Sequence, residues 1–250
     1  MNKKTLLLTL GGLVSASAAF AQISLNSTGS NVYTQNMAGL SGETWADDST
    51  LSGWHADWAT DPNWEAVPVG GANGLLRYGA NDGGTEYALG SRNTGGNPSV
   101  VFGANFLNNT GSAIDINIDY QGEQWYVGSQ TTNDGLVFEY STDATSLSTG
   151  SWTAVSALDF DAQSTSGSGT LLTPGNEGII ASISSDINFG LSNSSEFWIR
   201  WTDTDDGTGT DHGLAVDSFK LSVTAVPEPS TYALLSGMLA LTWVMVRRRG

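Results

Sequence analysis

The sequence predicts an all-β protein, an antiparallel jelly-roll-like β-sandwich over residues 22–225 with a short segment at each end. Apolar residues recur at every second position in several runs, which is typical of strands with one buried face. Clusters of Gly, Asn, Asp, Ser and Thr separate these runs as turns, and no long helical periodicity interrupts them. About 200 residues suffice for one domain of this kind.

Five runs carry the strand prediction. In the clearest, Ile114, Ile116, Ile118 and Tyr120 alternate with acidic or amide side chains, so one face is expected to contact water. Residues 22–99 are expected to supply the first strands of the same sandwich. The runs are 100–106, 114–120, 136–140, 197–201 and 219–223.

Composition excludes several classes of protein. A net charge of −16 and an isoelectric point near 4.1 exclude a basic nucleic-acid-binding protein. The chain has no cysteine, which excludes disulfides, thiolate metal sites and cysteine nucleophiles. Five of the nine basic residues lie in the terminal segments, which leaves four against 24 acids in residues 22–226, a net charge of −20. Such a body repels anionic polymers and attracts divalent cations.

Residues 1–21 have the three parts of a signal peptide. Lys3 and Lys4 precede an apolar stretch, and small residues follow it. Ala19 and Ala21 fit the rule for small residues before the cleavage site, so signal peptidase is expected to cut before Gln22 after export through the Sec translocon.

Residues 226–250 form an equally ordered C-terminal segment. Pro227, Glu228 and Pro229 precede an apolar run over 231–246, and Arg247, Arg248 and Arg249 follow it. As a helix the 16-residue run rises about 24 Å, against about 30 Å for a bilayer core, and flanking arginine stems can lengthen it. The segment therefore predicts a single transmembrane helix that holds the protein transiently at the inner membrane, with the arginines in the cytoplasm.

This order of Pro-Glu-Pro, apolar span and terminal arginines resembles the PEP-CTERM sorting signal of exported bacterial proteins. The resemblance implies processing near Pro227-Glu228-Pro229 by an exosortase, followed by release to the cell surface or the extracellular space. The family is typical of bacteria that make exopolysaccharide and biofilm. Residues 100–225 more weakly resemble laminin-G-like and MAM-like jelly rolls, through the strand and turn runs 124–125, 140–143, 152–155, 197–201 and 213–217.

Catalytic motifs are missing from the sequence. Only His55 and His212 could serve as a histidine base, and the G-x-S-x-G elbow, the P-loop and the dinucleotide fingerprint are all absent. His55 near Asp57 fits a catalytic base with its orienting partner, but histidines in polar loops are more often non-catalytic. Paired carboxylates of a glycan-acting hydrolase are compatible with so acidic a chain, although nothing marks one pair. We therefore expect no enzymatic activity.

Two groups of residues indicate binding. Asp203, Asp205, Asp206 and Asp211 lie in an Asp- and Gly-rich stretch that could hold a structural Ca²⁺ through oxygen ligands, or form a solvated loop. No other cofactor is expected. Trp45, Trp54, Trp58 and Trp64 are mixed with acidic residues and could stack on sugar rings, or fill the core.

Three functions follow from these observations. The leading interpretation is an exported, exosortase-sorted surface or matrix protein whose non-catalytic β-sandwich has a structural or adhesive role. The alternative is a carbohydrate-binding module, with or without Ca²⁺, that acts on exopolysaccharide. A glycan-acting hydrolase is the third.

Overall fold

A computed structural model describes residues 22–41, 44–58, 73–79, 87–95, 99–130, 134–165, 169–172, 180–204, 209–227 and 229–249. Two seven-stranded sheets make up the body. Sheet A contains β1 (Ile23–Leu25), β3 (Trp54–Asp57), β6 (Val100–Asn108), β8 (Gly135–Ser141), β9 (Thr153–Ala154), β10 (Phe160–Asp161) and β13 (Glu196–Asp203). Sheet B contains β2 (Gly29–Gln35), β4 (Gly74–Tyr78), β5 (Ala88–Arg92), β7 (Ile114–Val127), β11 (Thr170–Leu171), β12 (Ile180–Leu191) and β14 (Gly213–Ala225).

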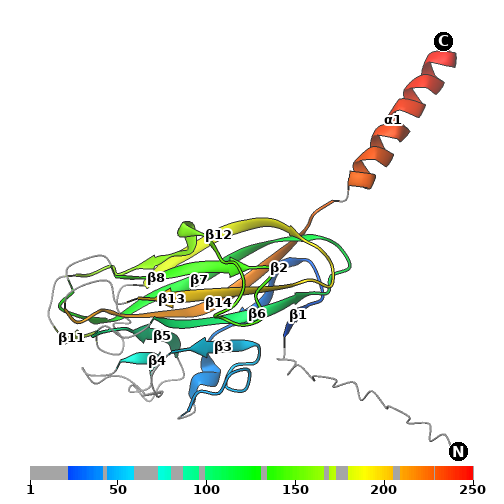
Figure 1. Cartoon of the computed structure of the whole chain (residues 1–250). Coiled ribbons are helices and arrows are strands. Elements are labelled where there is room, and N and C mark those ends of the chain that lie inside the picture. Colours follow the sequence, from blue (N-terminus) through cyan, green and yellow to red (C-terminus); the bar gives the residue numbers. More distant parts are fainter. Residues whose placement is uncertain are drawn as a thin grey trace, which may run out of the picture.

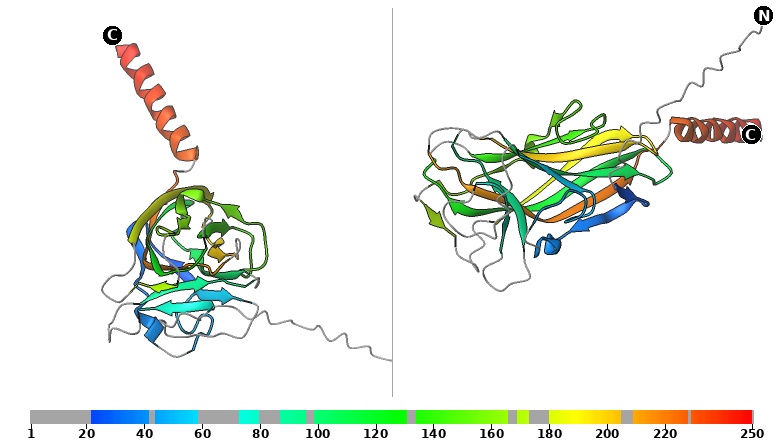
Figure 2. Two further views of the ribbon diagram at one scale, coloured as in Figure 1. Left: turned by 90° about the vertical axis from the view of Figure 1, so that its left-hand side faces the viewer. Right: turned by 60° about the horizontal axis from the view of Figure 1, so that its bottom comes forward.

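Each sheet is built around long antiparallel pairs. In sheet A, β13 lies between β6 and β8, so that Ile199 is opposite both Ala104 and Tyr140. In sheet B, β7 lies between β14 and β12. Strand β1 differs in pairing parallel with β6. The two views in Figure 2 show the sheets wrapped around a common interior.

The predicted antiparallel β-sandwich is confirmed, and each of the five predicted runs lies within β6, β7, β8, β13 or β14. Residues 22–99 supply strands β1 to β5, as expected. The finer jelly-roll description stays a prediction. The described residues of the body also include two short 3₁₀ turns, η1 (Ala38–Ser41) and η2 (Ser156–Leu158).

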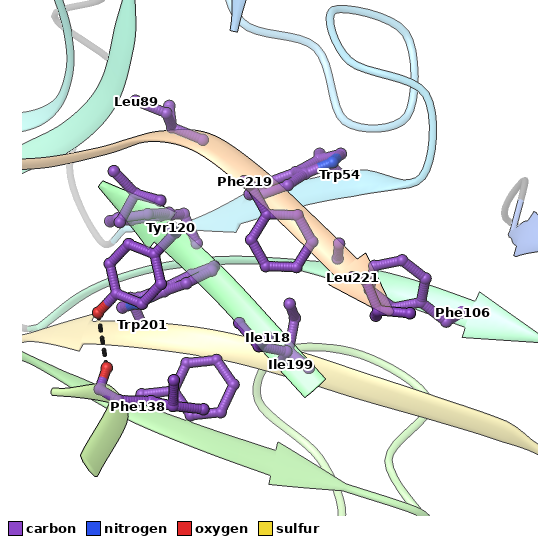
Figure 3. Packing of buried hydrophobic residues seen from close by; sticks show 14 of the residues in the cluster. Trp54, Leu89, Phe106, Ile118, Tyr120, Phe138, Ile199, Trp201, Phe219 and Leu221 are labelled. Atoms are coloured by element: carbon purple, nitrogen blue, oxygen red, sulfur yellow. Dashed lines mark hydrogen bonds between the residues drawn. The ribbon is translucent and has the colours of Figure 1, made fainter. Parts of the chain in front are cut away.

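Aromatic rings fill the space between the sheets. Trp54 and Trp201 stack with ring centres 6.1 Å apart and planes 5° apart, and Phe219 meets Trp54 edge-on (Figure 3). The Tyr120 hydroxyl donates a 2.6 Å hydrogen bond to the carbonyl of Leu158, which satisfies its buried polar atom. Burial raises the pKa of this phenol far above its usual range, so it stays a neutral donor.

The outer face of sheet A carries different chemistry. Arg200 donates from Nε (2.8 Å) and Nη2 (2.6 Å) to the Glu139 carboxylate on the neighbouring strand. Its guanidinium lies 3.9 Å from the ring centre of Trp152. A third bond, of 2.5 Å, joins Arg200 Nη1 to the carbonyl of Leu147. Arg200 therefore fastens the segment between β8 and β9 onto the sheet.

The C-terminal helix α1 (Pro229–Arg249) stands clear of the sandwich beyond the end of β14 (Figure 1). It begins at Pro229, a first-turn position that suits a residue without an amide proton. In the part of the chain that the structure describes, no helix is both long and apolar enough to cross a membrane. The predicted transmembrane helix over 231–246, the membrane contact and the inner-membrane anchoring are therefore wrong. The physical reason is length and composition, because the apolar run is shorter than a bilayer core and contains Ser236, Gly237 and Thr242.

Candidate functional site

An ordered polar segment between β8 and β9, residues 142–152, forms the centre of the candidate site, and we name it the outer loop. Ser141 Oγ accepts the backbone N–H groups of Asp143 (3.2 Å) and Ala144 (3.0 Å). The Asp143 carboxylate accepts the N–H of Ser151 at 2.7 Å and so closes the loop. Gly150 has φ of +78°, and a Cβ there would lie 2.6 Å from the Cα of Ala144, so the turn requires glycine.

Apolar packing holds the underside of the outer loop. Ala144 and Leu147 bury against Trp198 of β13, which is only 2% exposed. Val101 and Trp152 pack around this cluster. The loop therefore rests on the sheet through a small core of its own, and its polar side chains face two hollows.

The first hollow, which we name the edge groove, has a volume of about 410 Å³. Tyr140 of β8 and Phe189 of β12 meet there edge-to-face, with ring centres 5.7 Å apart. Both rings are half-buried at the edge where the two sheets approach. The lining residues are Tyr140, Ser141, Thr142, Asp143, Ser151, Thr153 and Phe189.

Asp143 supplies the charge of the edge groove. The hydrogen bond from the Ser151 backbone, and then that from the Ser141 hydroxyl, hold the pKa of its carboxyl below the usual value. Asp143 is therefore an ionised acceptor at neutral pH. Together the groove offers two aromatic rings, several hydroxyls and one carboxylate.

The second hollow lies on the other side of the outer loop, and we name it the outer cleft. Its volume is about 220 Å³, and it is lined by Asp47, His55, Ala56, Asp57, Ser146, Leu147, Ser148 and Trp198. Asp47 Oδ1 accepts the indole N–H of Trp45 at 2.6 Å and the backbone N–H of Ala56 at 3.0 Å. Partial burial by itself would raise the pKa of Asp47, but the nearby His55 imidazole and the hydrogen bonds from Trp45 and Ala56 outweigh it and lower that pKa.

His55 is a packed residue in the outer cleft. Its Nδ1 lies 3.7 Å from Asp47 Oδ2, and its ring centre lies 4.9 Å from that of Trp198. The sequence pairs His55 with Asp57, whereas the structure brings Asp47 to the imidazole. The Ser146 hydroxyl bonds to Thr149 (3.2 Å) within the outer loop, so this serine serves the turn.

The four tryptophans of the predicted carbohydrate site do not share one outcome. Trp54 is fully buried in the core and has no face to offer a sugar, so its predicted role as a carbohydrate platform is wrong. Trp45 and Trp58 are half-buried and pack against the core, while Trp64 lies outside the described residues. The core interpretation therefore holds for Trp54, because β3 presents it between the sheets.

The structure describes two of the four predicted calcium ligands. Asp203 and Asp211 are each 1% exposed at one end of the sandwich, and Asp205 and Asp206 lie outside the described residues. Among the ranges described, no three acidic or histidine side chains gather to hold a metal ion. Ca²⁺ binding stays a prediction.

His212 follows Asp211 and is as deeply buried. Its Nδ1 accepts the backbone N–H of Gly128 at 2.9 Å, which requires a neutral ring with the proton on Nε2. Burial also lowers the pKa of His212, so the imidazole is neutral at pH 7. His212 thus acts as a structural acceptor at this end.

The structure describes none of the predicted signal peptide but most of the C-terminal segment. The signal peptide, with Ala19 and Ala21, and also Glu228 of the sorting motif lie outside the described residues, whereas Gln22 is the first residue described. Pro227 precedes α1, and Arg247 lies 5.3 Å from the ring centre of Trp243 near the helix end.

Comparison with known proteins names no family, because no family model and no curated protein matches the chain. Among solved structures, the K2 cleaved adhesin domain of Lys-gingipain is 14% identical with a TM-score of 0.41, over 76% of this chain and 97% of that chain. The carbohydrate-binding module TmCBM27, described with specific mannan recognition, is 12% identical with a TM-score of 0.38 over 78% and 96%. The module TmCBM61, in complex with β-1,4-galactotriose, is 12% identical with a TM-score of 0.34 over 68% and 88%.

A bacteriophage CBA120 tailspike enzymatic domain is 7% identical with a TM-score of 0.37, and the chain spans 20% of its length. At such low scores these likenesses carry no argument about a ligand or a reaction.

The edge groove was not predicted from the sequence. Tyr140 belonged to a predicted strand, and Phe189 lies on β12, a strand that the five runs did not include. The one available signal was the polar stretch 141–153, which is long for a hairpin connection and rich in Ser and Thr. The pairing of Tyr140 with Phe189 joins residues from two different sheets.

Proposed function

We propose that this protein is a non-catalytic β-sandwich that binds an uncharged saccharide in the edge groove. The observation that carries the proposal is the pair of half-buried rings, Tyr140 and Phe189, in a hollow otherwise lined by hydroxyls and one carboxylate. A sugar ring presents an apolar face of C–H groups and a rim of hydroxyls. Aromatic rings suit the first, and polar side chains suit the second.

Size and charge favour the same ligand. A volume of about 410 Å³ falls in the usual range for small-molecule sites, about 300–1,000 Å³. No lysine or arginine is among the described lining residues, and Asp143 is ionised. An anionic saccharide would therefore meet repulsion without a compensating cation, so a neutral glycan fits best.

The charges also argue against hydrolysis of that glycan. Glycosidases use two carboxyl groups across the scissile bond, and the acid partner needs a raised pKa. The described lining of the edge groove contains one carboxyl, Asp143, and its pKa is lowered. The site is thus suited to holding a sugar, and an adhesive role of the protein follows from such binding.

Affinity electrophoresis through a panel of neutral and acidic polysaccharides tests the proposal. Tyr140→Ala should weaken binding of the retained neutral glycan about tenfold, since it removes one ring of the pair. Thr153→Val, which preserves shape and removes one hydroxyl, should weaken it less. Tyr87→Ala is the matched control, because Tyr87 is also a half-buried tyrosine packed on the core but lies outside the groove.

Two outcomes would overturn the proposal. One is migration unchanged by every neutral glycan. The other is an equal loss of affinity in Tyr140→Ala and Tyr87→Ala, which would assign the effect to stability. The sorting role of residues 226–250 stays a prediction from the sequence.

A further inference from the structure

We infer that the outer cleft is a second binding site, and that it takes the ammonium group of an amino sugar. The cleft is separated from the edge groove by the outer loop, which contributes Ser146, Leu147 and Ser148 to the cleft and Thr142, Asp143 and Ser151 to the groove. The two hollows therefore share a wall but no lining residue.

The charged side chains that line the outer cleft favour a positively charged ligand. Asp47 is held ionised by its hydrogen bonds, and Asp57, two residues after His55 on β3, adds an exposed carboxylate. No lysine or arginine is among the described lining residues. Arg200, on the same row of the sheet as His55, is already engaged by Glu139 and Trp152. The described lining of the cleft thus holds two carboxylates, and its one basic side chain is the imidazole of His55 beside Asp47.

The other residues that line the outer cleft favour a ligand that has hydroxyl groups as well as a positive charge. Ser148 can donate and accept hydrogen bonds, and Ser146, whose hydroxyl donates to Thr149, can still accept one. Trp198 lines the cleft, is 2% exposed, and its indole N–H has no hydrogen-bond partner within the described ranges. An acceptor oxygen that enters to this depth would give the N–H its missing partner. A plain alkylammonium ion supplies no such oxygen, whereas an amino sugar supplies hydroxyl and ring oxygens.

Space limits how much of the ligand enters. A volume of about 220 Å³ corresponds to about seven water molecules at their liquid volume of about 30 Å³. One aminated sugar unit, with its neighbours outside the cleft, matches that space. The choice of a sugar as the bearer of the amine rests on the proposed function, whereas the preference for an ammonium group rests on the cleft alone.

The test compares two oligosaccharides that differ only in the amine. The full chain is titrated with a trimer of glucosamine and with its N-acetylated counterpart, at a pH where the free amine is protonated. Binding is followed by two-dimensional NMR of the indole N–H signals, in which Trp198→Phe identifies the signal of Trp198. We expect the glucosamine trimer to shift that signal and to bind at least about fivefold more tightly than the N-acetylated trimer. Higher salt should narrow this difference.

Asp57→Asn should reduce the preference for the amine about threefold, because it removes one exposed carboxylate and preserves the shape. Asp186→Asn is the matched control, since it removes the same charge from exposed strand β12 in sheet B. Equal affinities for the two trimers would overturn the inference, and so would equal effects of Asp57→Asn and Asp186→Asn. Tyr140→Ala separates the two proposals, because it should weaken binding of neutral glycans about tenfold and leave the amine preference intact.

Discussion

Strand β13 places one tryptophan on each face of sheet A, and the two lie in different surroundings. Trp201 points inward, where it stacks on Trp54 and meets Phe138 and Tyr120 edge-on. Trp198 points outward and is covered by the outer loop, with Trp152 and Arg200 nearby. Burial is nearly equal at the two positions, 0% and 2% exposed. The difference is in what covers them, since a second sheet covers Trp201 and a polar loop covers Trp198.

Side chains on the inner face of sheet A should contribute more to the free energy of unfolding than side chains on its outer face. Trp201→Ala should lower the free energy of unfolding by about 3–5 kcal/mol, because the lost ring leaves a cavity between rigid sheets. Trp152→Ala removes a ring of the same size from the outer loop and should lower it by about 1 kcal/mol, through the lost cation–π contact. Urea denaturation monitored by circular dichroism measures both values. Similar losses in the two variants would contradict the distinction between the faces.

The ion pairs allow a second comparison, between a partly buried pair and an exposed pair. Arg200→Gln should lower the free energy of unfolding by about 1–3 kcal/mol, because it leaves the half-buried Glu139 without its charged partner. Lys220→Gln breaks the pair with Asp119, whose side chains are 46% and 41% exposed, and should change stability by less than about 0.5 kcal/mol. Added salt should weaken the Lys220 pair more. A larger effect at Lys220 would contradict the burial argument.

The end of the sandwich that carries Asp203 and Asp211 is a third environment. Added calcium tests whether it holds the predicted ion. If the stretch around Asp203 and Asp211 holds Ca²⁺, a concentration ten times the dissociation constant should stabilise the fold by about 1.4 kcal/mol. Thermal unfolding with millimolar CaCl₂, MgCl₂ and EDTA measures this effect. Asp203→Asn should remove the response to calcium. An unchanged melting curve in all three solutions would end the calcium prediction.

The smallest expected effect is the pH dependence of the outer cleft. The folded pKa of Asp47 is lowered, so its contribution to stability is present above the unfolded pKa of about 3.9 and is lost as the pH falls through the folded pKa. Because the Asp47 side chain is 44% exposed, solvent screening keeps this contribution below about 1 kcal/mol. Between about pH 5 and pH 3, the wild-type protein should lose slightly more stability than Asp47→Asn. Identical pH profiles by denaturation would contradict the contacts assigned to Asp47.

Local patterns in the chain predicted parts of five strands, but they did not predict β12 or the candidate site. Alternation along 114–120 or 197–201 gives the secondary structure because each strand must bury one face. The same alternation says nothing about which strand lies opposite, so Tyr140 and Phe189 could not be paired in advance. The tryptophans of 45–64 were ambiguous for the same reason, since only the position of β3 beside β6 sends Trp54 into the core.

The sequence by itself determined the β class, the acidic body without cysteine and the central parts of five strands, because these depend on composition and on neighbours along the chain. Only the tertiary structure decided that Asp47, and not Asp57, faces His55, and that one polar loop separates two hollows. Those contacts depend on how β3, the segment before it and the outer loop pack together on sheet A, and no alternation pattern along the chain contains that information.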